Sequence, residues 1–517
     1  MKKFKLFPLA IAALALGSCS TDDTADNNPS AEGVKSYIAV NINNVGAGGT
    51  RDLSNDDFEN GTDKENQINL VRFYFFNQDG SAYNMADGKN YIEQSVTGNG
   101  TQAPNVERIT DAVLVIDGAT RTAPHSMAAV INPATSDLGA ENLTRSQLEG
   151  KVCKGFFTGT GSDATGFVMS NSVYVAEGAK TWFSNISGKV STVSADDAKS
   201  NPVDIYVERV AAKVTSTATG ATDGKFEVGT TENGKKVYAQ IKGWGIANTN
   251  AKANLVKNID TSWTNDMLGF TPWNADNYYR CFWETSDDTE LTTVVSYNSL
   301  TTLINGVIYT QPNTSATSSP EYIAAAQLVY EDGTQAEICQ YKGVQYLSEN
   351  DVKKVILGEN KQYFKKTVST ADGDTYVNLS ESDLKFVTNT THSYQVNANL
   401  VDDNLKLYKK SGDTWNDVTD EAKAALAKEP AQIRKAGMAY YFTKINHLGA
   451  AGKTAQFGLV RNHVYKIDVN TITGFGTPVY NPDEAFDPVV PEQENTYLAA
   501  RINVLSWRVV KQTVDLK

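Results

Sequence analysis

Two strands of similar sequence, near opposite ends of the chain, constrain the fold more than any other feature. "SYIAVNINNV" occupies residues 36–45 and "TYLAARINVL" occupies residues 496–505. Aligned, they share a tyrosine, an alanine, an isoleucine and an asparagine. Each alternates apolar with other side chains, which is typical of a half-buried β-strand. Either both are ordinary edge strands, alike because such strands draw on few residue types, or both fit the same groove.

The rest of the composition favours an all-β fold in more than one domain. A chain of 517 residues exceeds one ordinary core, so two domains are expected. Glycine and tyrosine are plentiful, with 38 and 24 residues, and strongly helical stretches are few. The formal charge of −13 argues against nucleic acid as a partner.

The N-terminus has the pattern of an export signal. Lys2, Lys3 and Lys5 precede an apolar run over residues 6–16, which is too short to span a bilayer. The run ends in "LGSC", so we expect residues 1–19 to be a lipoprotein signal peptide with lipid attached to Cys19. An ordinary secretory signal does not need this cysteine.

Segment boundaries follow from changes in composition. We predict a propeptide over residues 20–51 containing the first strand, an N-terminal domain over residues 52–220, and a C-terminal domain over residues 221–476. The Gly- and Thr-rich stretch 215–224 marks the boundary between the two domains, after a strand over residues 203–214. Short helices are expected at residues 143–150, 349–357 and 420–429.

The last 41 residues consist of a proline-rich linker, residues 477–495, which we call the leash, followed by a strand segment. Residues 477–495 contain four prolines and are expected to stay extended, with a reach of roughly 60 Å at about 3 Å per residue. Residues 496–517 follow as two short strand segments with a bulge at Ser506-Trp507. The apolar side chains of this segment are Leu498, Ala500, Ile502, Val504, Trp507, Val510, Val514 and Leu516.

The sequence contains no pattern that indicates an enzyme, a cofactor or a metal. It has four histidines and no motif typical of a hydrolase, a metalloprotease or a nucleotide-binding protein. The "DGD" at residues 372–374 is interpreted as a β-turn rather than a Ca²⁺ site. Cys153, Cys281 and Cys339 are expected to be buried thiols, with one disulfide plus one free thiol as the alternative. Trp263, Trp273 and Trp283 are interpreted as core packing rather than a sugar site.

The position of Arg51 suggests a function for the two similar strands. It lies in a Gly-rich loop directly after the first strand and before Asp52, and exposed loops are where proteases cut. If Ile38, Val40 and Ile42 fill a groove, cleavage after Arg51 would free this plug strand and expose an apolar edge. The C-terminal strand of a second copy has a matching pattern and could fill that groove by strand addition. Such a head-to-tail contact need not close and generates a fibre.

Several motifs resemble the fimbrillins of Bacteroidales, the shaft subunits of the type V pilus, in particular the minor-fimbria (Mfa-type) branch. The resemblance rests on the lipobox, the arginine in a Gly-rich loop, and "YVERVAAKV" at residues 206–214. It also rests on "LVRNHVYKIDV" at residues 459–469 and the tail "INVLSWRVVKQTVDL" at residues 502–516. Residues 251–321 match nothing in the family.

The resemblance implies two tandem transthyretin-like β-sandwiches with a C-terminal donor-strand extension. It implies a precursor anchored as a lipoprotein in the outer membrane, and a trypsin-like, arginine-specific protease that cuts after Arg51. The partners implied are further copies of the chain, the anchor and tip subunits of a fimbria, and surface ligands of host or bacterium. The alternative is an uncleaved outer-membrane lipoprotein, either a pilus anchor or a surface glycan-binding module.

Overall fold

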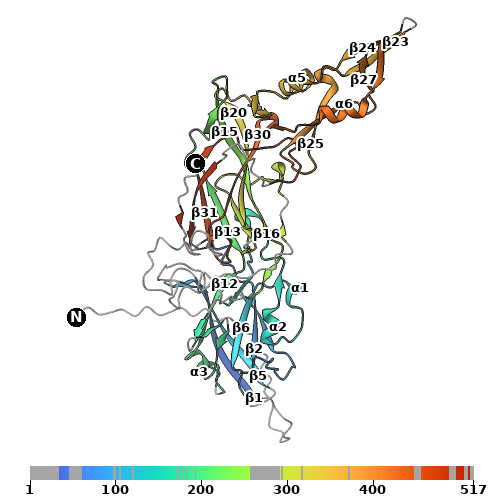
Figure 1. The fold of residues 1–517 in the computed structure, drawn as a ribbon. Coiled ribbons are helices and arrows are strands. Elements are labelled where there is room, and N and C mark those ends of the chain that lie inside the picture. Colours follow the sequence, from blue (N-terminus) through green and yellow to red (C-terminus); the bar gives the residue numbers. More distant parts are fainter. Residues whose placement is uncertain are drawn as a thin grey trace, which may run out of the picture.

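The computed structural model is an elongated molecule built largely of β-strands, with few and short helices (Figure 1). It describes residues 34–45, 61–96, 101–103, 106–118, 122–171, 174–176, 179–181, 183–192, 194–256, 291–292, 295–315, 318–370, 373–447, 456–487, 497–505 and 511–512. The expectation of an all-β fold with sandwich domains is confirmed.

The N-terminal sandwich is one sheet that folds around its own core. Its strand order is β3-β2-β6-β8-β12-β1-β5-β4, and β11 pairs with β6. The strands are β1 (Val34–Val45), β2 (Leu70–Phe76), β3 (Tyr91–Ser95), β4 (Thr101–Ala103), β5 (Val106–Gly118), β6 (Ser126–Ile131), β8 (Met169–Asn171), β11 (Ser184–Asn185) and β12 (Val203–Arg209). Side chains from β1, β5 and β12 share one buried cluster with side chains from β2 and β6.

Strands β2 and β6 are mostly apolar and do not alternate, because both of their faces are buried. Phe73 and Phe75 of β2 point into the core shared with β1, whereas Tyr74 and Phe76 pack in a second cluster on the opposite face. That second cluster includes Leu148 of helix α2 (Arg145–Glu149), which begins at a Thr144 capping box. A strand buried on both faces cannot alternate.

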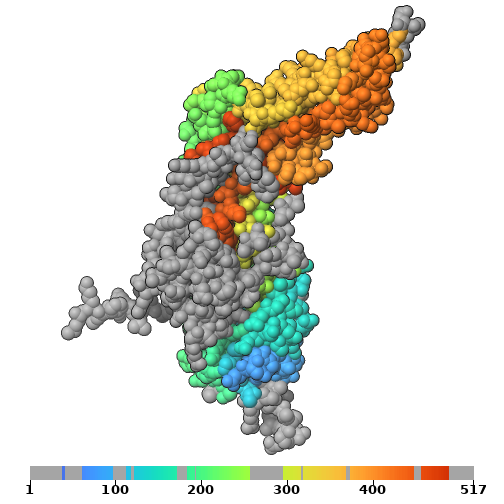
Figure 2. All heavy atoms as spheres, viewed as in Figure 1, coloured from blue at the N-terminus to red at the C-terminus, as the bar shows by residue number. Residues whose placement is uncertain are grey.

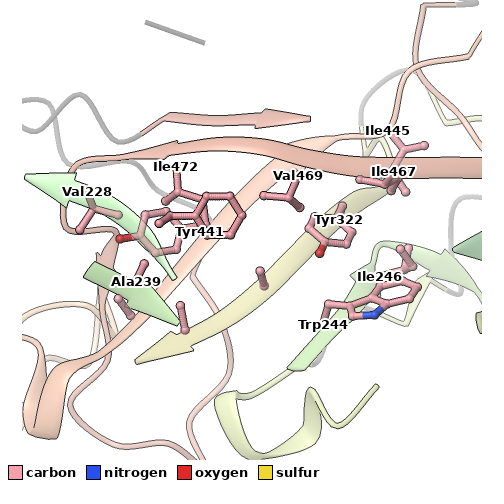
Figure 3. Close-up of a cluster of buried hydrophobic side chains, with 14 of the residues drawn as sticks. Val228, Ala239, Trp244, Ile246, Tyr322, Tyr441, Ile445, Ile467, Val469 and Ile472 are labelled. Carbon is pink, nitrogen blue, oxygen red and sulfur yellow. The ribbon is translucent and has the colours of Figure 1, made fainter. Parts of the chain in front are cut away.

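The C-terminal sandwich consists of two five-stranded sheets packed face to face. One sheet has the order β19-β13-β31-β33-β34 and the other β14-β15-β20-β30-β32. Their bounds are β13 (Ala212–Thr217), β14 (Phe226–Thr230), β15 (Lys236–Ala247), β19 (Val307–Thr310), β20 (Glu321–Tyr330), β30 (Met438–Lys444), β31 (Val464–Thr473), β32 (Thr477–Pro478), β33 (Tyr497–Leu505) and β34 (Lys511–Gln512). Between the sheets, Trp244 stacks on Tyr322 at 5.5 Å, and Ile467 and Val469 of β31 complete the core (Figure 3).

The chain passes from one sandwich to the other between Arg209 and Ala212. The sequence predicted a single strand over residues 203–214, and this is wrong: β12 belongs to the N-terminal sheet and β13 to the C-terminal one. Val210 and Ala211, both fully buried, lie between the two strands and pack in different cores. The expected Gly- and Thr-rich boundary at residues 215–224 begins within β13.

A third unit, which we call the arm, is inserted between β20 and β30 and has its own core. It comprises β21 (Cys339–Tyr341), β22 (Val344–Tyr346), α5 (Glu349–Glu359), β23 (Phe364–Thr370), β24 (Gly373–Asn378), β25 (Leu384–Thr388), β26 (Val396–Leu400), β27 (Leu407–Ser411), β28 (Thr414–Asp417), α6 (Thr419–Leu426) and β29 (Ala431–Ile433). The arm projects from the upper end of the C-terminal sandwich (Figures 1 and 2). This core is not among the domains predicted from the sequence.

The remaining elements are short and connect the larger ones. They are α1 (Thr135–Leu138), α3 (Ala195–Lys199), β7 (Val152–Cys153), β9 (Tyr174–Ala176), β10 (Ala179–Thr181), β16 (Thr249–Asn250), β17 (Ala253–Asn254) and β18 (Leu291–Thr292). The three helices expected from the sequence correspond to α2, α5 and α6.

Candidate strand-exchange site

Strand β1 lies in the interior of the N-terminal sheet, between β12 and β5. It runs antiparallel to β5 from Val34↔Gly118 to Val45↔Val106, and parallel to β12 from Val40↔Val203 to Asn44↔Val207. Both of its hydrogen-bonding edges are therefore used. Because β12 and β5 are joined in this sheet through β1, its removal would leave two facing strand edges without partners.

Side chains of β1 fill the core of the N-terminal sandwich. Ile38 and Val40 are fully buried and belong to the cluster that contains Leu114 of β5 and Ile205 of β12. Burying a side chain of this size contributes about 1.5–3 kcal/mol. Ile42 lies in register with Thr110 and Ile205, but its side chain is outside the described part of the chain. The backbone of β1 thus lies between two paired strands, with Ile38 and Val40 in the core.

The predicted processing residues fall outside the described part of the chain. These residues are Cys19, Arg51 and Asp52. The predictions for Trp263, Trp273, Trp283 and Cys281 also lie outside the described residues. The lipidation site and the cleavage site therefore stay predictions.

The segment that enters the fold after the predicted cleavage site is fixed by a buried carboxylate, Glu65. Its Oε1 lies 2.9 Å from Lys213 Nζ and accepts a hydrogen bond from Tyr309 Oη at 2.6 Å. Burial alone would raise the pKa of Glu65, but the cations of Lys213 and Arg209 outweigh it and lower the pKa to about 2. The residue is charged in the folded protein and paired across the two sandwiches.

Arg209 extends this cluster to the loop before β31. Its Nε donates to the Glu65 carbonyl oxygen at 2.9 Å and its Nη1 donates to Asn462 Oδ1 at 3.1 Å. The Asn462 N–H donates to the Ala211 carbonyl oxygen at 2.8 Å. We call Glu65, Arg209, Lys213, Tyr309 and Asn462 the junction cluster. It joins the segment before β2, the crossover between the sandwiches and the loop before β31.

A second buried arginine, Arg461, also links the loop before β31 to the N-terminal sandwich. It is fully buried, and its Nη2 donates to Ser170 Oγ of β8 at 2.9 Å. The structure thus brings together the two internal motifs that carry the family resemblance, residues 206–214 and 459–469. The sequence analysis missed Glu65 and the role of these motifs. The sequence feature that could have indicated this cluster is the presence of charged residues inside the otherwise apolar "YVERVAAKV".

The C-terminal strand β33 lies on its own subunit, far along the chain from β1 and in a different sheet. It pairs antiparallel with β31, from Val464↔Leu505 to Thr473↔Tyr497, and β34 pairs with its other edge over two residues. Only the backbone of β33 is described, so nothing follows for Leu498, Ala500, Ile502 and Val504 beyond their register. Trp507, Val510, Val514 and Leu516 lie outside the described residues.

The described residues carry little that would support other chemistry. Within them, no group of three or more metal-ligating side chains is arranged to hold an ion. Cys153 and Cys339 are buried, and burial raises the pKa of the Cys339 thiol. Asp374 of the "DGD" stretch pairs with Lys366 at 2.7 Å within the β23–β24 hairpin. None of the helices described is long and apolar enough to cross a membrane.

The geometry defines an all-β protein in which two strands of similar sequence pattern, β1 and β33, belong to different sheets. Residues 434–513 match the model for "Major fimbrial subunit protein type IV, Fimbrillin, C-terminal". The resemblance to the fimbrillins is thereby confirmed. By its description, the matched family is one of major fimbrial subunits.

Solved structures that are similar over most of the chain are adhesion and fimbrial proteins. A candidate cell adhesion protein of Parabacteroides distasonis is 14% identical, with a TM-score of 0.37, over 92% of this chain and 97% of that chain. One from Bacteroides eggerthii is 13% identical, with a TM-score of 0.34, over 90% and 95%. The tip fimbrial protein Mfa3 of Porphyromonas gingivalis, truncated at its C-terminus, is 10% identical, with a TM-score of 0.32, over 90% and 99%. These scores are too low to carry an argument. A comparison with curated proteins finds no match.

Proposed function

We propose that the chain is the structural subunit of a cell-surface fimbria that polymerises by strand exchange. The observation that carries this proposal is the interior position of β1, with Ile38 and Val40 fully buried and both strand edges paired. Cleavage after Arg51 would cut the covalent link between this plug and the rest of the fold. The groove between β5 and β12 would then accept the C-terminal strand of a second copy.

The energetics favour replacement over an empty groove. Ile38, Val40 and Ile42 would each contribute about 1.5–3 kcal/mol when buried, and an incoming strand with Leu498, Ala500, Ile502 and Val504 would restore a comparable apolar surface. Trp507, Val510, Val514 and Leu516 would extend the contact. Because donor and acceptor lie on different parts of the molecule, the contact is head-to-tail and extends into a fibre.

Export and anchoring belong to the same proposal. The precursor would travel to the outer membrane as a lipoprotein with lipid, such as palmitate, on Cys19. A trypsin-like, arginine-specific protease would then act between Arg51 and Asp52. Anchor and tip subunits would cap the fibre, and ligands on host or bacterial surfaces are its expected targets in cell adhesion.

The junction cluster fits this sequence of events. Glu65 lies 14 residues after Arg51 and is held by an ion pair and hydrogen bonds that involve no residue of the propeptide. The mature N-terminus would therefore stay attached to both sandwiches when the plug leaves.

The pairing of β33 with β31 in the same subunit favours a second candidate function. A chain that keeps both terminal strands in place could remain an uncleaved outer-membrane lipoprotein, either a pilus anchor or a surface glycan-binding module. In that case Cys19 would stay on the mature protein and the chain would not form multimers.

The N-terminal sequence of protein from the cell surface distinguishes the two candidates. A start at Asp52 supports the fimbrial subunit, whereas a blocked, lipidated Cys19 supports the uncleaved lipoprotein. Arg51→Ala should yield lipidated monomers, and Lys64→Ala, at an exposed basic residue in the same stretch, is the matched control that should be processed normally. Fibres of normal length from Arg51→Ala would contradict the proposal.

A further inference from the structure

The first half of the proline-rich leash is not extended but is fastened to the body of the molecule. The sequence predicted a linker over residues 477–495 with a reach of roughly 60 Å. In the structure this stretch begins as β32, which pairs with β30 through Ala439↔Pro478 and Tyr440↔Thr477. Residues 479–487 then follow the surface of the C-terminal sandwich and the base of the arm.

Backbone hydrogen bonds hold this segment along its length. Val479 donates its N–H to the Met438 carbonyl oxygen at 3.2 Å. Further on, the Asn298 N–H donates to the Pro482 carbonyl oxygen at 3.1 Å, and the Phe486 N–H donates to the Val295 carbonyl oxygen at 2.7 Å. Contacts spaced in this way restrain the whole segment rather than one point of it.

Phe486 anchors the end of the segment in an aromatic cluster. Its side chain is 8% exposed and lies 5.0 Å from the ring of Tyr440 and 5.2 Å from that of Phe442, both on β30. Both contacts are near-perpendicular, the edge-to-face arrangement that aromatic pairs favour. An aromatic side chain buried in this way is a stronger attachment than a surface turn.

The arm holds the same end from the other side. Ser393 Oγ donates to the Ala485 carbonyl oxygen at 3.0 Å, and His392 Nδ1 lies 3.1 Å from Asp487 Oδ2. At the start of the segment, the Lys435 ammonium lies 4.4 Å from the centre of the Tyr480 ring. The segment is thus fastened between the arm and the sandwich.

We infer that Phe486 and Asp487 form a fixed origin for the C-terminal strand, so that the strand can reach only a neighbouring copy whose groove lies close to this point. Nine residues, Pro488 to Thr496, separate Asp487 from β33. At full extension they span about 30 Å, which is about half the roughly 60 Å of an unattached leash. The fastened segment thereby sets the spacing and orientation of successive subunits. This inference rests on the proposed strand exchange for its consequence, but not for the anchor itself.

Amide hydrogen exchange on the full chain tests the anchor without any assembly. Exchange at Val479 and Phe486 should be slow in the wild type. Phe486→Ala should accelerate exchange across residues 479–487 while β31 stays protected. Ser393→Ala combined with His392→Ala tests the arm contacts without touching the aromatic cluster, and should accelerate exchange mainly at residues 485–487. Trp415→Ala, on the far part of the arm, is the control and should change neither. Unprotected amides at residues 479–487 in the wild type would overturn the inference.

Shortening the leash tests the consequence. Deleting residues 492–495 removes about 14 Å of reach and should reduce multimer formation at least tenfold. Phe486→Ala in the shortened chain should restore it, because residues 479–487 become available as linker. A shortened chain that assembles like the wild type would contradict a fixed origin. So would Phe486→Ala in the shortened chain if it does not restore multimer formation. If the wild type forms no multimers while residues 479–487 stay protected, strand exchange fails and the anchor stands.

Discussion

Glu65 and Lys213 form an ion pair of 2.9 Å that is buried between the two sandwiches. Glu65 enters from the segment before β2, whereas Lys213 belongs to the first strand of the C-terminal sandwich. The pair therefore ties the beginning of the proposed mature chain to the second domain. A buried pair of this kind is weak evidence for net stability, but breaking it on one side leaves an uncompensated charge.

Replacing one member of this pair should therefore destabilise the protein strongly. Lys213→Met is expected to lower the free energy of unfolding by about 3–5 kcal/mol, because the Glu65 carboxylate then stays buried without its ammonium partner. Adding Glu65→Gln in the same chain should recover much of the loss. Lys64→Ala removes an exposed pair with Asp163 and should cost less than about 1 kcal/mol. Denaturant unfolding measures all of these, and a Lys213→Met chain as stable as the control would refute the argument.

The depressed pKa of Glu65 predicts a defined dependence of stability on pH. The pKa is about 2 in the folded protein and about 4.5 in the unfolded chain, so the unfolded state binds the proton first as pH falls. The stabilisation, about 3 kcal/mol, is complete above roughly pH 5 and is lost between pH 4.5 and 2.

The comparison with Glu65→Gln isolates this contribution from other carboxylates. The difference in unfolding free energy between the wild type and Glu65→Gln should be largest above pH 5 and shrink towards pH 2. A difference that stays constant from pH 7 to pH 2 would mean that Glu65 does not titrate in this range.

The plug strand should be a main contributor to the N-terminal core before cleavage. Ile38→Ala removes a fully buried side chain and is expected to cost about 2–5 kcal/mol in the uncleaved chain. Val115→Ala, on the neighbouring strand β5 with 49% of the side chain exposed, is the control and should change stability by about 0.5 kcal/mol or less. Equal costs for the two variants would mean that β1 does not fill the core.

Alternation along a single strand was enough to predict β1, and the short helices expected at residues 143–150, 349–357 and 420–429 correspond to α2, α5 and α6. The break between β12 and β13 was not, because Val210 and Ala211 continue the apolar pattern while the chain changes sheets. The junction cluster depends on contacts between residues more than 140 positions apart, such as Arg209 with Glu65, which no local pattern reveals. The attachment of residues 479–487 could not be predicted for the same reason. Proline content describes local stiffness, whereas Phe486 is held by Tyr440 and Phe442 of β30.

The C-terminal strand offers the most direct test of polymerisation. Ile502 is in register with Ile467 of β31 and carries the same alternation as Ile42 in the plug strand. Ile502→Asp would place a carboxylate where the groove between β5 and β12 expects an apolar side chain, so multimers should not form. The free energy of unfolding of the N-terminal sandwich should be unchanged, because β33 belongs to the C-terminal sandwich. Asn503→Asp, one position further on, adds the same charge on the opposite face and should still assemble. If Ile502→Asp instead unfolds the monomer, the strand is part of its own domain's core rather than a donor.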